Sequence, residues 1–341
     1  MIYYSIFLVL SAFYLYLSRR WGEGWYLYLI PIAIAVFFSG FRYDAGNDYF
    51  TYYRMIDGYF DSANLEYLPR NLIAYARWTK NPAFFFFVTS LAYVLCISYF
   101  CKRHSDNPEL SFLLFLLLPL SFLTSFGYVR QFIAIGFFTV SLSLLVDRRV
   151  IISGIFFFFA FLCHSSVILF LFVFLFYRMM SSRIYPWWIY FSLLTVVFPI
   201  SQIITQYAYL TGDYAHYLLG EKSVDSGKKI GLLCVSFFFY FFAFRKRLNN
   251  KSDVFFFNVY FAFSFLYLLL MGFGEYVVRI TYYLFPCAYI LFVSTLSKRT
   301  HVFLIQIIGV ILLGILTYYT TLYFASINPT RDFLTNYSFI F

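Results

Sequence analysis

Three arginines lie beside long apolar runs, where a bilayer tolerates no unpaired charge. Arg42 follows one run, Arg130 lies between two, and Arg279 precedes another. A guanidinium stays charged at physiological pH and binds phosphate through two parallel hydrogen bonds. Converging arginines would therefore form a site for a diphosphate or another polyanion. The alternative is that each one reaches the membrane interface or pairs with a nearby acid such as Asp44 or Glu275.

His164 lies in a short polar break between two apolar runs, followed by Ser165 and Ser166. An ordinary histidine titrates near neutral pH, so His164 is a candidate general base. The alternative is a structural histidine at a helix terminus, bonded to a backbone carbonyl, with the two serines as caps.

Two carboxylates, Asp44 and Asp48, are spaced four residues apart. They could share a helix face, but Gly46 between them favours a turn. They could bind sugar hydroxyls, position an acceptor, or hold arginines such as Arg54. Tyr49 and its aromatic neighbours could stack on sugar rings, although a membrane-interface belt explains most of them. A metal site has little support, because no histidine is adjacent and oxygen ligands from one turn are non-specific.

The composition bounds the class of protein. Of 341 residues, 62% are hydrophobic, 26% aromatic and only 12% charged. The apolar runs are continuous rather than alternating, which favours helices over a barrel and predicts an all-α polytopic membrane protein. We expect about 12 transmembrane helices, at about 2–18, 25–40, 82–100, 110–126, 130–146, 150–163, 165–178, 186–206, 230–245, 253–272, 279–296 and 301–320.

The net charge of +10 is explained by topology rather than by nucleic acid. Every second break between the predicted spans is rich in Lys and Arg and poor in acids. By the positive-inside rule these breaks face the cytoplasm, so both termini are periplasmic. The arginines at 42, 130 and 279 and His164 then fall on the external side.

We predict one integral-membrane domain, 1–341, with two longer external segments. Segment 41–81 mixes aromatic, apolar and basic residues, which predicts a helix lying in the interface. Segment 207–229 is polar and broken by glycine, so a mobile loop or a lid is one interpretation.

At these residues the chain resembles the EpsG family of Wzy-type polysaccharide polymerases. The matching pieces are spread along the chain in family order: Gly40-Phe-Arg42, Gly46-Asn-Asp-Tyr49 with Tyr52, Val129-Arg-Gln131 with Ala134, His164-Ser-Ser166, and Arg279 with Tyr282.

The resemblance implies an enzyme of the bacterial inner membrane that polymerises lipid-linked repeat units of O-antigen, capsule or exopolysaccharide. The growing glycan would leave undecaprenyl diphosphate and join the non-reducing end of the next lipid-linked unit at the periplasmic face. Further implied partners are a chain-length regulator and a flippase. A fold similar to GT-C membrane glycosyltransferases and O-antigen ligases follows by analogy only.

In such a reaction Arg42, Arg130 and Arg279 would hold the diphosphate, and His164 or Asp48 would take the acceptor proton. No metal or other cofactor is then required. The predicted substrate-binding residues are Arg42, Asp44, Tyr49, Arg54, Gln131, Glu275 and Tyr282. We expect Arg42, Arg130, His164 and Arg279 to line one external cavity.

Two other classes of protein stay open. A flippase or transporter of a lipid-linked sugar would place charges near the midplane of the membrane, whereas these charges gather at span ends. An O-antigen ligase or an acyltransferase that uses His164 would differ in product: a single attached glycan or an ester, instead of a longer glycan.

Overall fold

The computed structural model describes residues 1–21, 25–207, 225–248, 250–296, 300–327 and 334–340. Helices dominate, which confirms the all-α class. Within the described residues, six helices are long and apolar enough to cross a membrane: Ile2–Arg20, Pro82–His104, Val129–Val146, Trp187–Ile204, Lys251–Leu270 and His301–Ile327. The total number of spans and the side on which the termini lie stay predictions.

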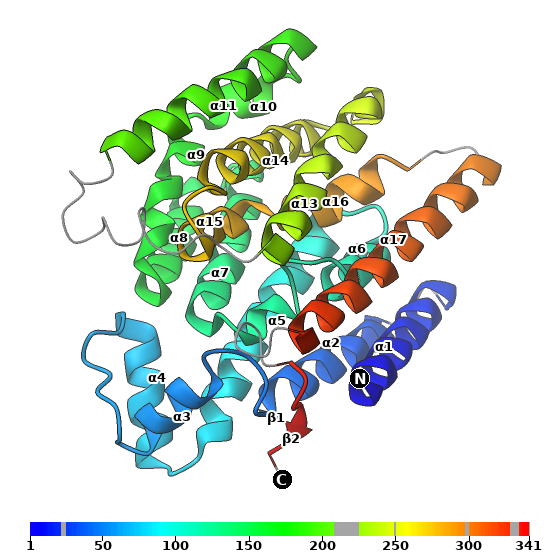
Figure 1. Ribbon diagram of the computed structural model, residues 1–341. Coiled ribbons are helices and arrows are strands. Elements are labelled where there is room, and N and C mark those ends of the chain that lie inside the picture. Colours follow the sequence, from blue (N-terminus) through cyan, green and yellow to red (C-terminus); the bar gives the residue numbers. More distant parts are fainter. Residues whose placement is uncertain (22–24, 208–224, 249, 297–299, 328–333, 341) are drawn as a thin grey trace. The chain divides into compact units, whose positions relative to one another are not determined.

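The chain divides into two compact units, and each is described by itself. The first comprises Met1–Leu169 and Arg299–Phe341. Its elements (Figure 1) are α1 (Ile2–Arg20), α2 (Trp25–Gly40), β1 (Arg42–Tyr43), α3 (Tyr49–Ile56), α4 (Tyr67–Trp78), α5 (Pro82–His104), α6 (Pro108–Leu117), η1 (Thr124–Phe126), α7 (Val129–Val146), α8 (Val150–Cys163), most of η2 (Ser165–Phe170), α17 (Thr300–Ile327) and β2 (Ser338–Phe339).

The second unit comprises Phe170–Lys298. Its elements are α9 (Leu171–Leu175), α10 (Tyr177–Ser182), α11 (Trp187–Tyr207), α13 (Asp225–Ala243), η4 (Arg245–Arg247), α14 (Lys251–Leu270), α15 (Glu275–Val278), η5 (Arg279–Leu284) and α16 (Cys287–Ser294). The longest helix of this unit within the described residues is α11, which contains Pro199.

Three predicted spans are wrong as continuous helices. The prediction 110–126 ends early, because Pro119 forces Leu118 into an extended conformation (ψ 149°) and α6 stops at Leu117. The prediction 279–296 is divided at Pro286 into the 3-10 helix η5 and the short helix α16. The prediction 165–178 is divided into η2, α9 and the start of α10.

In the first unit, the basic ends of several helices gather at one end. Arg103 at the end of α5 pairs with Asp147 after α7, with 2.8 Å between Nε and Oδ2. Arg19 at the end of α1 lies 3.9 Å from Glu109 in the first turn of α6. The ends of α1, α5 and α7 and the start of α6 therefore lie at one end of this unit, in agreement with the positive-inside pattern, and the sidedness itself stays a prediction.

The opposite end of the first unit holds both ends of the chain. Strand β2 pairs antiparallel with β1, so that Arg42 faces Phe339. The hydroxyl of Tyr4 in α1 donates to the carbonyl of Leu334 at 2.7 Å. The hydroxyl of Tyr337 donates to the carbonyl of Phe38 at 2.8 Å. Residues 334–340 thus pack against the end of α2, against β1 and against the start of α1.

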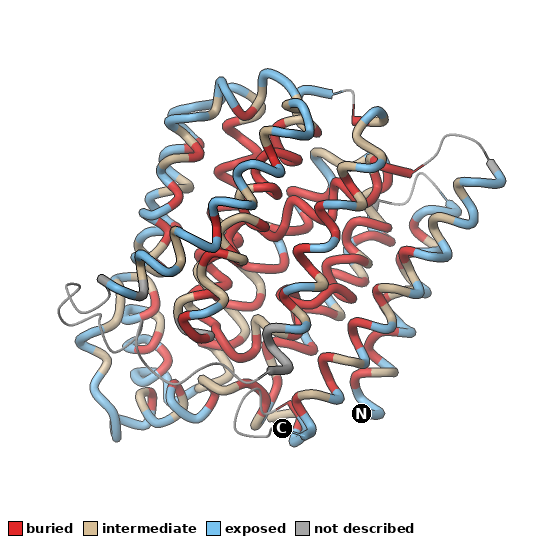
Figure 2. Tube along the Cα trace, turned by 45° about the horizontal axis from the view of Figure 1, so that its top comes forward, coloured by how far each residue is buried: buried red, intermediate tan, exposed pale blue. Residues whose placement is uncertain are grey.

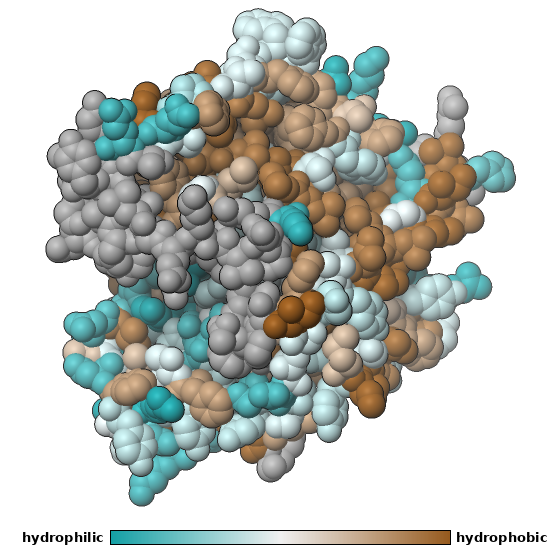
Figure 3. All heavy atoms as spheres, viewed as in Figure 1, coloured by the Kyte–Doolittle hydropathy of each residue, from teal (hydrophilic) through white to brown (hydrophobic). Residues whose placement is uncertain are grey.

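Helix α17 carries an apolar face that no other described element of the first unit covers. Figure 2 shows exposed and buried positions mixed along it, and Figure 3 shows hydrophobic atoms gathered over it, whereas hydrophilic atoms are frequent over α3 and α4. The most exposed apolar side chains of α17 include Leu304, Ile305, Leu312 and Leu316. Such a face suits contact with lipid tails.

The turn between β1 and α3 is fixed by Gly46. Its φ is +102°, and a Cβ there would lie 1.9 Å from the carbonyl oxygen of Phe126. Only glycine allows both this backbone conformation and this close approach. Gly46 therefore allows the turn to pack closely against Phe126 of η1, and the turn that its presence predicted replaces a continuous helix.

We predict that Gly46→Ala destabilises the protein far more than Gly58→Ala. Gly58 also has a positive φ (+86°), but nothing lies within 4 Å of a Cβ built there. Gly58→Ala should cost about 1 kcal/mol for the backbone alone. Gly46→Ala should add about 1–3 kcal/mol for overpacking. Thermal unfolding midpoints of the detergent-purified variants measure the difference, and equal midpoints would contradict the close packing.

Candidate active site

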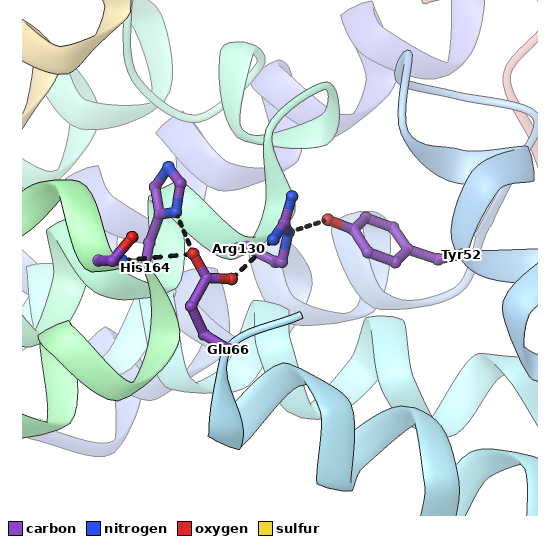
Figure 4. A network of polar contacts seen from close by, with 5 residues as sticks. Tyr52, Glu66, Arg130 and His164 are labelled. Atoms are coloured by element: carbon purple, nitrogen blue, oxygen red, sulfur yellow. Dashed lines mark hydrogen bonds and ion pairs between the residues drawn. The ribbon is translucent and has the colours of Figure 1, made fainter. Parts of the chain in front are cut away.

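The carboxylate of Glu66 connects three segments of the first unit (Figure 4). Its Oε2 accepts from Nη1 of Arg130 at 2.6 Å, and its Oε1 accepts from Nδ1 of His164 at 2.7 Å. The backbone N–H of Ser165 also donates to Oε1, at 3.3 Å. Glu66 is the N-cap residue of α4, but its side chain makes no capping hydrogen bond to that helix. Arg130 lies in the first turn of α7, and His164 follows the end of α8.

Arg130 is fixed by two side chains and remains partly accessible. Besides its bond to Glu66, its Nε donates to the hydroxyl of Tyr52 in α3 at 2.9 Å. The Arg130 side chain is 30% exposed. Within the described residues its Nη2 has no hydrogen-bond partner. The guanidinium is therefore oriented by the protein and keeps N–H groups that an anion could accept from.

The charge on Glu66 determines which nitrogen of His164 carries a proton. Burial raises the pKa of Glu66, but the hydrogen bond from His164 and the positive charge of Arg130 outweigh it and lower the pKa to about 2. An ionised carboxylate can only accept hydrogen bonds, so Nδ1 of His164 must be protonated. Figure 4 shows the other ring nitrogen, Nε2, pointing away from Glu66. In neutral His164 this Nε2 has a free lone pair, as a general base requires.

The imidazole thus bonds to a carboxylate, and not to a backbone carbonyl as the structural alternative expected. The main chain of His164 does cap α8, since its N–H donates to the carbonyl of Ala160 at 2.9 Å. The backbone of His164 therefore ends α8, while its imidazole ring is free to bond to Glu66.

Arg42 is buried and bonded to the backbone. Its Nε donates to the carbonyl of Ala45 at 3.0 Å, and its other nitrogens donate to the carbonyls of Ser39 and Phe126. The guanidinium lies 4.8 Å from the ring centroids of both Phe86 and Phe126, a cation–π arrangement. Burial lowers the pKa of Arg42 to about 10, so it stays charged at neutral pH. Its contacts hold the turn together, and its role as a diphosphate anchor stays a prediction.

The other predicted residues of the first unit surround this turn. Asp44 has a φ of +51° within the turn, and Asp48 is the N-cap residue of α3. Tyr49 is fully buried, with its ring stacked on that of a phenylalanine of α5, and burial raises its pKa. Arg54 is exposed, with its guanidinium 5.6 Å from a phenylalanine ring. Gln131 is buried beside Arg130. Their roles in binding substrate stay predictions.

The remaining predicted residues belong to the second unit. Arg279 begins η5, Tyr282 is buried within it, and Glu275 begins α15. The side chain of Glu275 lies outside the described residues. Because Arg279 lies in the second unit, its place in a common cavity with Arg130 stays a prediction. Of the predicted lid at 207–229, residues 208–224 lie outside the described part, and its last residues, from Asp225, are helical in α13.

Sequence reasoning missed Glu66 as a site residue and treated Tyr52 only as part of the family pattern. Glu66 is one of several acids in segment 41–81 and has no local pattern that distinguishes it from Asp57 or Asp61. Its partners are 64 and 98 residues away along the chain. Only the tertiary structure brings them together.

Fold and site together define an all-α polytopic membrane protein with a paired Arg–Glu–His cluster at one end of its first unit. Within the part of the chain that the structure describes, no three His, Cys, Asp or Glu side chains gather as metal ligands. The model of the EpsG family matches residues 25–339, and the chain belongs to this family. Membership supports a membrane polysaccharide-polymerase type of function. No curated protein and no solved structure matches the chain, so the likeness to GT-C glycosyltransferases stays a prediction.

We predict that Glu66→Gln destabilises the protein at pH 7 by about 1–3 kcal/mol, because it weakens hydrogen bonds to two charged or polar partners. The pKa of Glu66 falls from an ordinary 4.5 to about 2 in the folded protein. The ionised carboxylate therefore stabilises the fold above pH 4.5, and this contribution is lost as the pH falls towards 2. When thermal unfolding is measured from pH 7 down to pH 3, the difference between the unfolding midpoints of wild type and Glu66→Gln should become smaller.

Glu109→Gln is the matched control, since Glu109 lies at the basic end of the same unit and faces the exposed Arg19 at 3.9 Å. Such a pair contributes about 0–1 kcal/mol. If the two glutamine variants lost the same stability at pH 7, the network around Glu66 would have no special energetic role.

We also predict that Arg42→Lys lowers the thermal unfolding midpoint, whereas Arg54→Lys does not. A lysine cannot reach three carbonyls from one planar group, so buried acceptors would lose their partners, at about 1–3 kcal/mol for each. Arg54 is exposed and should tolerate the change. An unchanged midpoint for Arg42→Lys, with loss of activity per molecule, would instead favour a substrate-binding role for Arg42.

Proposed function

We propose that this protein is a polysaccharide polymerase of the bacterial inner membrane. It transfers a growing glycan from undecaprenyl diphosphate to the hydroxyl at the non-reducing end of the next lipid-linked repeat unit, at the periplasmic face. The product class is O-antigen, capsule or exopolysaccharide.

One observation carries the proposal. The carboxylate of Glu66 orients both His164 and Arg130, and each of these two side chains has one nitrogen that bonds to no described residue. Nε2 of His164 and Nη2 of Arg130 have no hydrogen-bond partner among the described residues. Glycosyl transfer from a diphosphate needs a base for the acceptor and a cation for the leaving group. The cluster supplies one group of each kind, and family membership supports the same class of reaction.

His164 activates the acceptor in this proposal. Its Nε2 removes the proton of the acceptor hydroxyl while the oxygen forms the new bond to the anomeric carbon. The resulting imidazolium is stabilised by the carboxylate of Glu66, which accepts from Nδ1 at 2.7 Å. Glu66 is thus a positioning residue that selects the useful tautomer and balances the charge that develops on the ring.

Arg130 stabilises the leaving group. When the bond between the anomeric carbon and the diphosphate oxygen breaks, the electron pair stays on the diphosphate. The N–H groups of Nη2 donate to this developing negative charge, and the bonds to Glu66 and Tyr52 keep the guanidinium in place beforehand. The imidazolium proton then leaves to water or to the released diphosphate. Arg279 is the candidate second cation.

The experiment is the glycan ladder of a strain that lacks this protein, complemented at matched membrane levels. Wild type should restore long chains, whereas His164→Ala and Arg130→Lys should leave single repeat units. Because charge alone does not reproduce a planar, two-point guanidinium contact, we expect Arg130→Lys to lose at least about tenfold in polymerised product, which corresponds to about 1.4 kcal/mol.

The matched controls lie at the basic end of the same unit. His104 bonds to the hydroxyl of Ser143 at 2.7 Å, and Arg103 pairs with Asp147. His104→Ala and Arg103→Lys should restore the wild-type ladder. Lipid-linked units trapped on the cytoplasmic side in the deletion strain would instead identify a flippase. A normal ladder that is never attached to its final acceptor would identify a ligase.

A further inference from the structure

The second unit contains an apolar groove between three helices. It encloses about 380 Å³. Along α14, Asn258, Phe261, Ala262 and Phe265 occupy one helix face, with the spacing i, i+3, i+4 and i+7. The opposite walls come from Met179 and Met180 of α10, from Tyr185, which precedes α11, and from Ile189, Tyr190 and Leu193 of α11. The small side chain of Ala262 lines the groove beside these two phenylalanines, whose ring centroids are 6.4 Å apart.

The polar groups within the groove are already bonded to one another. The hydroxyl of Tyr190 donates to Oδ1 of Asn258 at 2.7 Å. Nδ2 of Asn258 donates to the carbonyls of Met180 at 2.7 Å and Arg183 at 3.0 Å. An occupant therefore finds no polar group that needs a partner, and the groove suits hydrocarbon. The two methionines can adapt to a flexible chain.

The mouth of the groove is basic. Arg183 is exposed, and its guanidinium lies 5.4 Å from the ring centroid of Tyr185, which lines the groove. The bonds from Asn258 place the 180–183 segment beside the second turn of α14, just after the basic residues of η4. More Lys and Arg belong to the elements that meet here: Arg178 of α10, Arg245, Lys246 and Arg247 of η4, and Lys251, which begins α14.

Two exposed tryptophans mark the depth of the groove in the bilayer. Trp187 and Trp188, which begin α11, are 61% and 56% exposed. Exposed tryptophans at the end of a spanning helix favour the level of the lipid headgroups. Ile189 and Leu193 follow within two turns, so the apolar groove begins directly below that level.

From this arrangement we infer that the groove binds an anionic phospholipid, with one acyl chain in the groove and the phosphate at Arg183 and its basic neighbours. The apolar lining, the basic mouth and the tryptophans all belong to the second unit and are independent of the reaction proposed for the first unit. Clusters of Lys and Arg at the membrane surface attract anionic headgroups, by a factor of about five in affinity for each residue.

The test is native mass spectrometry of the delipidated full-length protein, titrated with phosphatidylglycerol or phosphatidylcholine of identical acyl chains. Wild type should bind one phosphatidylglycerol molecule at least about fivefold more tightly than phosphatidylcholine. Arg183→Ala should remove most of this preference, since the phosphate loses its nearest cation. Ala262→Trp, which fills the groove, should abolish the tight site for both lipids.

Two controls separate the site from general lipid association. Arg20→Ala removes an exposed arginine from the basic end of the first unit, and Ala243→Trp adds the same bulk at an exposed position at the end of α13. Both should bind as wild type does. Should Ala262→Trp unfold, Ala262→Leu replaces it, with folding checked by thermal unfolding. Unchanged binding in the folded groove-filling variant, or equal affinity of wild type for the two lipids, would overturn the inference.

Discussion

The arrangement of the first unit depends on how one carboxylate is neutralised. Glu66 lies among the ends of apolar helices, where an unpaired charge would be costly, and it accepts from a guanidinium, an imidazole and a backbone N–H. Each of these donors belongs to a different segment from Glu66. The ends of α4, α7 and α8 must therefore meet if every charge is to have a partner, and the removal of any one member leaves the others partly unsatisfied.

Two arginines of similar sequence context differ in their hydrogen-bond partners. Arg42 lies between two aromatic rings. All three of its guanidinium nitrogens donate to backbone carbonyls in and beside the turn after α2. Arg130 donates to the side chains of Tyr52 and Glu66, and its Nη2 has no hydrogen-bond partner among the described residues. The residue type predicts a possible phosphate ligand in both cases. Only the structure shows that the guanidinium of Arg42 bonds to backbone carbonyls and that of Arg130 to side chains.

The sequence predicts most of the helices, because a long apolar run between charged breaks has few other solutions in a bilayer. It fails at 110–126 and 279–296, where the apolar composition continues across Pro119 and Pro286 while the helical hydrogen bonding does not. The sequence identifies Arg130 and His164 as candidate site residues, because they are ionisable side chains at the ends of apolar runs. Glu66 was not, because an acid in a polar segment is ordinary until the fold brings it to its partners.

The segment between α2 and α5 contributes two side chains to the cluster around Glu66. It supplies the carboxylate of Glu66 and the phenol of Tyr52, whereas the apolar helices supply Arg130 and His164. Helix α4 is held in place by Arg77, whose Nε donates to the carbonyl of Met55 at 3.2 Å, and by the ring of Tyr75 against that of Phe84. Because one carboxylate orients both His164 and Arg130, any displacement of α4 moves the two side chains relative to each other. In the proposed glycosyl transfer, Glu66 would thereby link acceptor activation to stabilisation of the leaving group.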